Sequence, residues 1–185
     1  MSGDAVFDGV SSGDLSGGAP VDRGRWAGYA TAACAFLFAL TSFYWGFGGT
    51  FALDTVGREA LERVQAGDPV IYFAVWFAGI VKTAGGFVAL ALVQPWGRRL
   101  FRHWMLLLAG WGGAAVLIVY GGVQIGIQLM VRAGVLVPPG GMDWRGFYGH
   151  LYIWDPWFIV WGVLMAITAG YYTRNARRRR LSTVN

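Results

Sequence analysis

Tyr-Gly-His-Leu-Tyr-Ile-Trp-Asp-Pro-Trp-Phe-Ile-Val-Trp, at Tyr148–Trp161, is the stretch that decides how the last apolar part of this chain begins. Proline fixes φ, is tolerated at the first position of a helix, and drives the preceding residue into an extended conformation. Asp155 can then accept hydrogen bonds from the first helical turn, where the helix dipole favours a negative charge. We therefore expect a helix that begins at Pro156, is capped by Asp155, and ends near Tyr172.

The whole chain is unusually apolar. Of its 185 residues, 56% are hydrophobic and 14% are charged, whereas soluble domains carry about a quarter charged residues. This composition excludes an ordinary soluble domain and predicts an integral membrane protein whose first partner is the lipid bilayer. The net charge of +5 does not indicate a nucleic-acid surface, because the arginines lie next to apolar runs, where they orient a membrane protein.

Four apolar runs define the predicted architecture. Each run is about long enough to cross a bilayer as a helix. Together they predict an all-α fold, an integral membrane four-helix bundle that occupies residues 23–173. The spans are expected over about residues 26–45, 70–93, 104–131 and 156–172.

A more polar segment separates the first two spans. Apolar residues recur in it at helical spacing, and Gly67 and Pro69 end the pattern. We therefore expect a short amphipathic helix that lies on the membrane surface. Its apolar residues are Leu53, Val56, Ala60, Leu61 and Val64.

Positive residues are divided unequally between the two sides that this topology defines. The side of the termini holds more arginines than the other, so the positive-inside rule predicts a cytoplasmic (inner) membrane protein with both termini in the cytoplasm. Residues 1–22, rich in Gly, Ser and Asp, are then a disordered tail, and residues 174–185 are a basic tail. The first side holds Arg23, Arg25, Arg98, Arg99, Arg102, Arg174 and Arg177–Arg180, and the second holds Arg58, Arg63, Arg132 and Arg145.

Lys82 is the sharpest single signal for a site. It lies near the middle of the second span, where a charge costs about 2.5–3.5 kcal/mol to insert. We expect it to face the interior of the bundle, beside polar residues of the third span. The alternative is a structural lysine that is neutral or is satisfied by carbonyls and water.

The third span offers matching polar residues. Tyr120, Gln124 and Gln128 are four positions apart and form one stripe along a helix. Unpaired amides are costly in hydrocarbon, so the two glutamines need partners. They can line a site, or they can hold two helices together. In the same span, the spacing of Gly122 and Gly126 lets another helix backbone approach closely.

These residues together predict a polar pocket that opens outward. Lys82 would form its floor, Tyr44 would contribute from the first span, and Asp155 and His150 would stand at its rim. For Asp155 the alternative is a plain helix cap, and for His150 it is an interfacial hydrogen bond. A lone His and a lone Asp with no further ligand do not indicate a metal site, and no motif for another cofactor is present.

One resemblance rests on three features of the sequence. Tyr44-Trp45-Gly46-Phe47-Gly48-Gly49, Lys82, and the run Leu151–Phe158 together resemble a bacterial family of small four-span membrane proteins, a domain of unknown function. The likeness extends over about Trp26–Tyr172. It implies the four-span topology and brings no activity, ligand or catalytic residue with it.

Three functions fit these observations. The first is a membrane protein that binds a small lipophilic or cationic molecule, or protons, in the outward pocket. The second is a membrane enzyme acting on an isoprenoid-like or quinone-like substrate, with Asp155, His150 or Lys82 as acid or base. The third is a structural subunit of a membrane complex, as a homo- or hetero-oligomer.

Overall fold

The computed structural model describes residues 25–137 and 141–182, and every helix and turn of these residues belongs to an all-α fold without strands. The expected tail at residues 1–22 lies outside this part of the chain. Within it, four helices are long and apolar enough to cross a membrane, which confirms the predicted fold class. They are α1 (Arg25–Gly46), α3 (Pro69–Val93), α5 (His103–Arg132) and α7 (Asp155–Ser182).

Short elements connect the long helices. The chain between α1 and α3 forms a single 3-10 turn and then a helix that is shorter than the predicted amphipathic helix, because it begins only at Arg58 and leaves Leu53 and Val56 outside. Its Val64 is buried in a cluster with Trp45 and Leu53. A short helix links α3 to α5, and another precedes α7. These elements are η1 (Leu53–Thr55), α2 (Arg58–Gln65), α4 (Pro95–Leu100), α6 (Trp144–Gly149) and the π-helical turn η2 (His150–Trp154).

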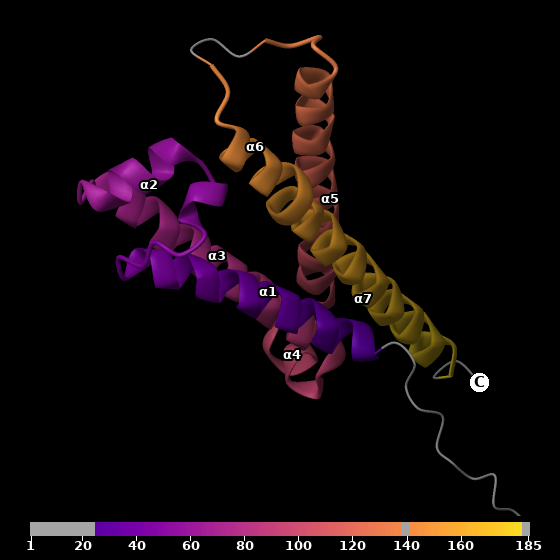
Figure 1. The fold of residues 1–185 in the computed structure, drawn as a ribbon. Helices are drawn as coiled ribbons and strands as arrows, with labels where there is room; N and C mark the ends of the chain where they lie inside the picture. Colours follow the sequence, from indigo (N-terminus) through magenta and orange to yellow (C-terminus); the bar gives the residue numbers. More distant parts are fainter. Residues whose placement is uncertain (1–24, 138–140, 183–185) are drawn as a thin grey trace, which may run out of the picture.

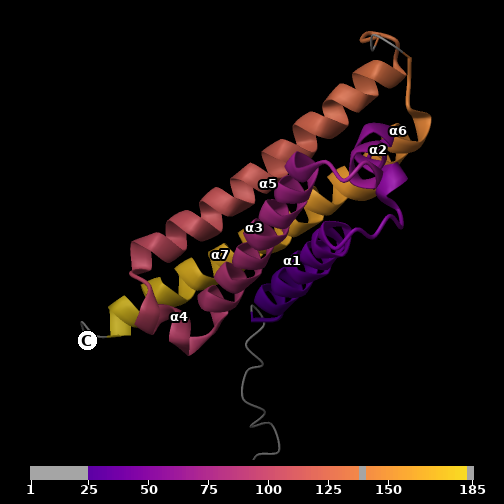
Figure 2. The ribbon, with the colours of Figure 1, turned by 90° about the vertical axis from the view of Figure 1, so that its left-hand side faces the viewer.

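The long helices pack as two pairs. α1 lies along α3, α5 lies along α7, and contacts between α1 and α7 join the pairs. Figures 1 and 2 show that α1 starts, and α7 finishes, at the end of the molecule that holds α4. We call this the α4 end, and we call the opposite end, with α2 and α6, the α2–α6 end.

Small residues bring α5 and α7 close together. A methyl group added at Gly121 of α5 would lie 2.8 Å from the Asp155 carbonyl oxygen, and one at Gly162 of α7 would lie 3.0 Å from the backbone nitrogen of Ile118. Gly122 and Gly126 instead face open space, with no atom within 4 Å of an added methyl group. The glycine pair that the sequence singled out therefore does not mediate packing among the residues that the structure describes.

The expected helix start at Pro156 is wrong. Asp155 has helical angles, φ −77° and ψ −38°, and its N–H donates to the His150 carbonyl five residues earlier. Helix α6 therefore continues through η2 into α7, and the apolar helix extends over Trp144–Arg177. Pro156 has no N–H, and in a regular α-helix its ring would collide with the carbonyl four residues before it. The wider π turn directly before Pro156 relieves this collision.

Candidate functional site

Asp155 is a fully buried carboxylate inside a helix rather than a cap at the start of one. The whole residue, backbone and side chain, is 0% exposed to solvent. Oδ2 accepts a hydrogen bond from Gln128 Nε2 on α5, and Oδ1 lies 3.3 Å from His150 Nδ1 in η2. An ionised carboxylate is costly to bury unless partners compensate its charge. The two side-chain partners therefore determine which charge state this position can hold.

The contact of the other ring nitrogen of His150, Nε2, fixes how many protons His150 and Asp155 hold together. Nε2 lies 3.0 Å from the carbonyl oxygen of Val56, which can only accept, so Nε2 carries a proton. The contact between Nδ1 and Asp155 Oδ1 then needs a proton of its own, on the imidazole or on the carboxyl group. In either arrangement, the pair holds one proton more than a carboxylate beside a neutral histidine.

Gln128 leaves one acceptor open at the same site. Its Nε2 donates to Asp155, while its Oε1 is buried and has no hydrogen-bond partner among the described residues. Buried polar atoms normally have a partner, so an open one marks a place where a donor can bind. A protonated Asp155 can supply that donor if the amide group turns over, because the two ends of a glutamine amide exchange roles.

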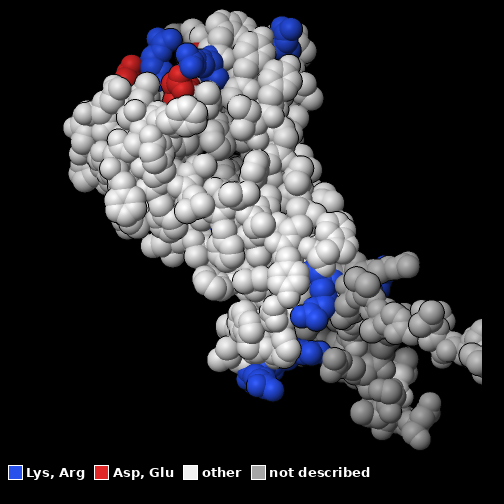
Figure 3. Space-filling view, turned by 60° about the horizontal axis from the view of Figure 1, so that its bottom comes forward, with Lys and Arg blue, Asp and Glu red and all other residues white. Residues whose placement is uncertain are grey.

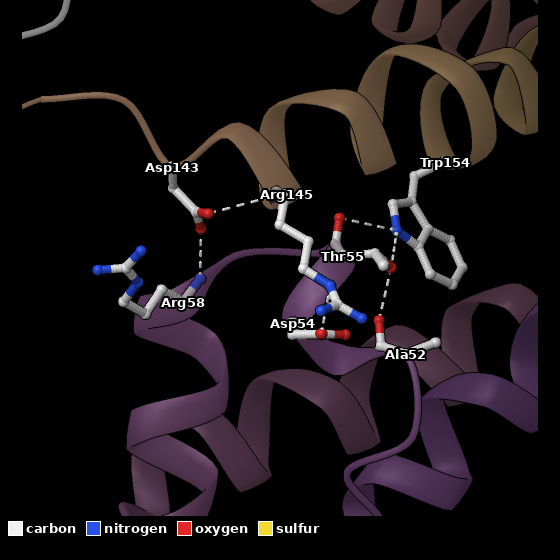
Figure 4. A network of polar contacts seen from close by, with 8 residues as sticks. Ala52, Asp54, Thr55, Arg58, Asp143, Arg145 and Trp154 are labelled. Carbon is white, nitrogen blue, oxygen red and sulfur yellow. Dashed lines mark hydrogen bonds and ion pairs between the residues drawn. The ribbon is translucent and has the colours of Figure 1, made fainter.

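Contacts join η1 and α2 to α6 and η2 at the α2–α6 end (Figure 4). Asp143 Oδ2 accepts from the backbone N–H of Arg58 at 2.7 Å, and Oδ1 accepts from that of Gly146 at 3.3 Å. Arg145 pairs with Asp54 at 2.6 Å, and Trp154 Nε1 donates to the hydroxyl of Thr55 at 3.1 Å.

The charge of Asp143 is stabilised by these contacts. The hydrogen bond from the backbone N–H of Arg58 is the main reason that its pKa lies below the usual value of 3.8. Its carboxylate therefore stays ionised at neutral pH and remains an acceptor for both helix starts.

Lys82 faces the interior, as expected, but its contacts are on α1. Nζ donates to Ser42 Oγ at 2.8 Å and lies 3.6 Å above the centre of the Phe38 ring. The expected neighbours Tyr120 and Gln124 on α5 are replaced by this hydroxyl and this aromatic face. No ion pair joins Lys82 to a carboxylate in the part of the chain that the structure describes. A cation–π contact and one hydrogen bond compensate the charge instead.

An aromatic cluster around Phe38 lies between Lys82 and the helix that carries Asp155. The Phe38 ring stacks on Trp154 at 5.9 Å and meets Phe158 edge-on at 4.9 Å. These two residues lie on either side of Asp155 in the sequence. The lysine and the carboxylate are therefore separated by rings rather than paired.

Among the described residues, the remaining predicted ones form no hydrogen bond with Lys82 or Asp155. Tyr120 packs edge-on against Phe158 and lines a shallow surface groove of α5 together with Gln124. The Tyr44 hydroxyl accepts from the backbone N–H of Phe51 at 3.4 Å near the α2–α6 end. The structure thus brings Asp155, His150 and Gln128 together and leaves Lys82, Tyr120, Gln124 and Tyr44 outside this group.

Sequence reasoning missed two residues of the site. The Val56 carbonyl is a backbone group that no side-chain pattern reveals. Asp143 carries a detectable signal, since an aspartate before Trp-Arg-Gly-Phe-Tyr is a common residue type at a helix start. Only the folded chain shows that Asp143 also caps a second helix, α2.

Residues 35–165 match the sequence family described as "Protein of unknown function (DUF3995)". The chain belongs to this family. The match confirms the resemblance to a family of unknown function, and the DUF3995 region contains Lys82, Gln128, His150 and Asp155. No curated protein and no solved structure matches the chain.

Proposed function

We propose that this chain is a four-span membrane protein that takes up and releases a proton at the Asp155–His150 pair. The proton count carries the proposal: the Val56 carbonyl occupies the Nε2 proton of His150, so the contact with Asp155 needs one more proton. Loss of that proton leaves a carboxylate facing the lone pair of Nδ1, which is repulsive. The pair therefore has two states with different local contacts.

The burial of the two side chains supports exchange from the α2–α6 end. The His150 side chain is 30% exposed, whereas that of Asp155 is 0% exposed. A proton reaches the carboxylate through the imidazole, which is the usual carrier near neutral pH. The neighbouring charges Arg145 and Asp54 pair with each other at 2.6 Å, so they add little net field at the site.

The distribution of arginines supports an orientation. At the α4 end, α1, α4, the start of α5 and the end of α7 carry arginines, and among the described residues no acid accompanies them there. The α2–α6 end carries both signs. We propose on the positive-inside rule that the α4 end faces the cytoplasm and that the proton site opens to the opposite side of an inner membrane.

Difference infrared spectroscopy of the purified protein in lipid nanodiscs tests proton binding directly. A pH change between about 4 and 9 should alter either the carboxylic acid band of Asp155 or the imidazole bands of His150. Asp155→Asn should remove this change while leaving the helical content intact. Asp68→Asn is a matched control, because it makes the same replacement at an aspartate outside the Asp155–His150 pair. Asp68 caps α3 by accepting a hydrogen bond from the backbone N–H of Val70.

One spectroscopic result would reject the proposal. Nitrogen-15 labelling of histidine reports which ring nitrogen of His150 carries a proton. An unprotonated Nδ1 next to an ionised Asp155 over the whole pH range would show that the pair holds no additional proton.

A further inference from the structure

A second cavity lies at the α4 end, away from the Asp155 site. Its volume is about 510 Å³, and parts of α1, α3, α4, α5 and α7 form its walls together with Gln94 between α3 and α4. Its polar lining is positive or neutral. The polar residues are Arg25, Gln94, Arg98, His103, Tyr171, Tyr172 and Asn175.

The two arginines of this cavity have no acidic partner among the described residues. Neither Arg25 nor Arg98 forms an ion pair within residues 25–137 and 141–182. Arg25 Nε is buried and has no hydrogen-bond partner in the same part of the chain. Among the described residues visible in Figure 3, the charged side chains at this end of the molecule are positive, whereas acidic ones accompany them at the other end. A buried guanidinium nitrogen is a charged donor, so this position favours an anionic acceptor.

Hydrogen bonds hold the polar walls in place. His103 Nδ1 lies 3.0 Å from the buried Tyr172 hydroxyl, and Gln94 Nε2 donates to Tyr29 at 2.6 Å. These contacts tie the start of α5 to α7, and the end of α3 to α1. Arg25 therefore lies on a helix that is fixed to the end of α3, and α4 with Arg98 begins directly after Gln94.

An apolar groove adjoins the polar cavity. Its volume is about 480 Å³, and Phe101 lines both the groove and the cavity. The groove passes between α3, α4 and α5, and its lining is almost entirely apolar. It is lined among others by Ala84, Phe87, Val88, Trp96, Leu100 and Met105.

We propose that the cavity and the groove together bind one anionic phospholipid. Arg25 and Arg98 hold its phosphate group, since the planar guanidinium matches phosphate oxygens. One acyl chain lies in the groove past Phe101. A basic pocket between membrane helices next to an apolar groove satisfies both parts of such a lipid. This inference is independent of the proton site at the other end.

Lipid binding to the full-length protein in detergent tests the proposal. Thermal stability is measured while phosphatidylglycerol, phosphatidylcholine or inorganic phosphate is added. Phosphatidylglycerol should bind more tightly than phosphatidylcholine, and inorganic phosphate at the same concentration should stabilise little because it has no chain. Equal stabilisation by inorganic phosphate would show a site for free anions and would overturn the lipid assignment.

Matched variants separate this site from general surface charge. Arg25→Gln and Arg98→Gln should each weaken phosphatidylglycerol binding by about tenfold, the loss of one charged hydrogen bond. Arg99→Gln removes the same charge from α4 at a residue that does not line the cavity, and should leave binding unchanged. Equal losses in Arg98→Gln and Arg99→Gln would overturn the proposal.

The groove has its own variant. Ala84→Trp places a ring in the groove without touching the arginines. It should weaken binding of long-chain phosphatidylglycerol more than that of a short-chain analogue. Equal effects on both lipids, with the arginine variants behaving as expected, would show that the acyl chain lies elsewhere and would overturn the placement in the groove.

Discussion

Asp143 accepts a hydrogen bond at 2.7 Å from the backbone N–H of Arg58, a residue 85 positions earlier in the chain. Arg58 is the first residue of α2, and its N-cap position is Gly57, which has no side chain to cap the helix. The same carboxylate caps α6 through Gly146. One side chain therefore serves the starts of two helices and fastens the end of the molecule above the Asp155–His150 pair.

Removal of this double cap should loosen that end. We expect Asp143→Ala to lower the free energy of unfolding by about 1–2 kcal/mol, and Asp143→Asn to lower it less, because asparagine also caps helices. The pKa of Asp143 is lowered in the folded protein. Its stabilisation is therefore complete above the unfolded pKa, about 4, and is lost as the pH falls through the folded value. Thermal unfolding in detergent at several pH values measures this, and a pH dependence identical in wild type and Asp143→Ala would contradict it.

Gly149 should not tolerate a side chain. Its backbone angles are helical, φ −59° and ψ −48°, so an alanine there is not strained by its own conformation. A methyl group would overlap the Thr55 carbonyl of η1, which is backbone and cannot rotate away. We expect Gly149→Ala to lower stability by about 1–3 kcal/mol through overpacking.

Gly122→Ala is the matched control for that variant. Gly122 lies in the interior of α5 and faces open space. Because alanine is the better helix former, the control should be neutral or slightly stabilising. A loss of stability equal to that of Gly149→Ala would show that the contact with η1 is not the cause.

The contact between Lys82 and Phe38 should be measurable as a coupling energy. Lys82→Met removes the charge and keeps most of the bulk, so we expect little loss of stability or a small gain. In a double-mutant cycle with Phe38→Leu, the cation–π contact should give a coupling of about 0.5–2 kcal/mol. Thermal unfolding of the four proteins provides it. A coupling of zero would place the ammonium group away from the ring.

The proposed orientation predicts which side of the membrane each end reaches. In a Cys34→Ala background, Ala66→Cys at the end of α2 should react with a membrane-impermeant maleimide in whole cells. Leu181, near the end of α7, is 71% exposed in the structure. Leu181→Cys should react only after the cells are lysed. The reverse pattern would invert the orientation.

Most of the architecture was predictable because long apolar runs have few alternatives in a membrane. Asp155, His150 and Gln128 were all candidates from the sequence, but their contacts with one another were not predicted, because Asp155 and His150 were expected at the rim of a pocket with Lys82 as its floor. The start of the last helix was not predictable, because the Asp155–Pro156 step fits the first turn of a helix and the position after a π turn inside a helix equally well. The packing of α6 on η1 decides between them. The direction of Lys82 was likewise set by tertiary contacts with Ser42 and Phe38.

The π turn η2 also sets the angular relation between α6 and α7. Each residue of an α-helix turns the chain by about 100°, so one additional residue in a turn rotates everything before it by that amount. With η2, the side chains of Asp143 and Arg145 meet α2 and η1 while Asp155 and Phe158 meet the other spans. If this turn tightened to a regular α-helix, α6 and α7 would be rotated relative to each other and could no longer both face their present partners. Then α6 would have to detach from η1, or α7 would have to roll against α5.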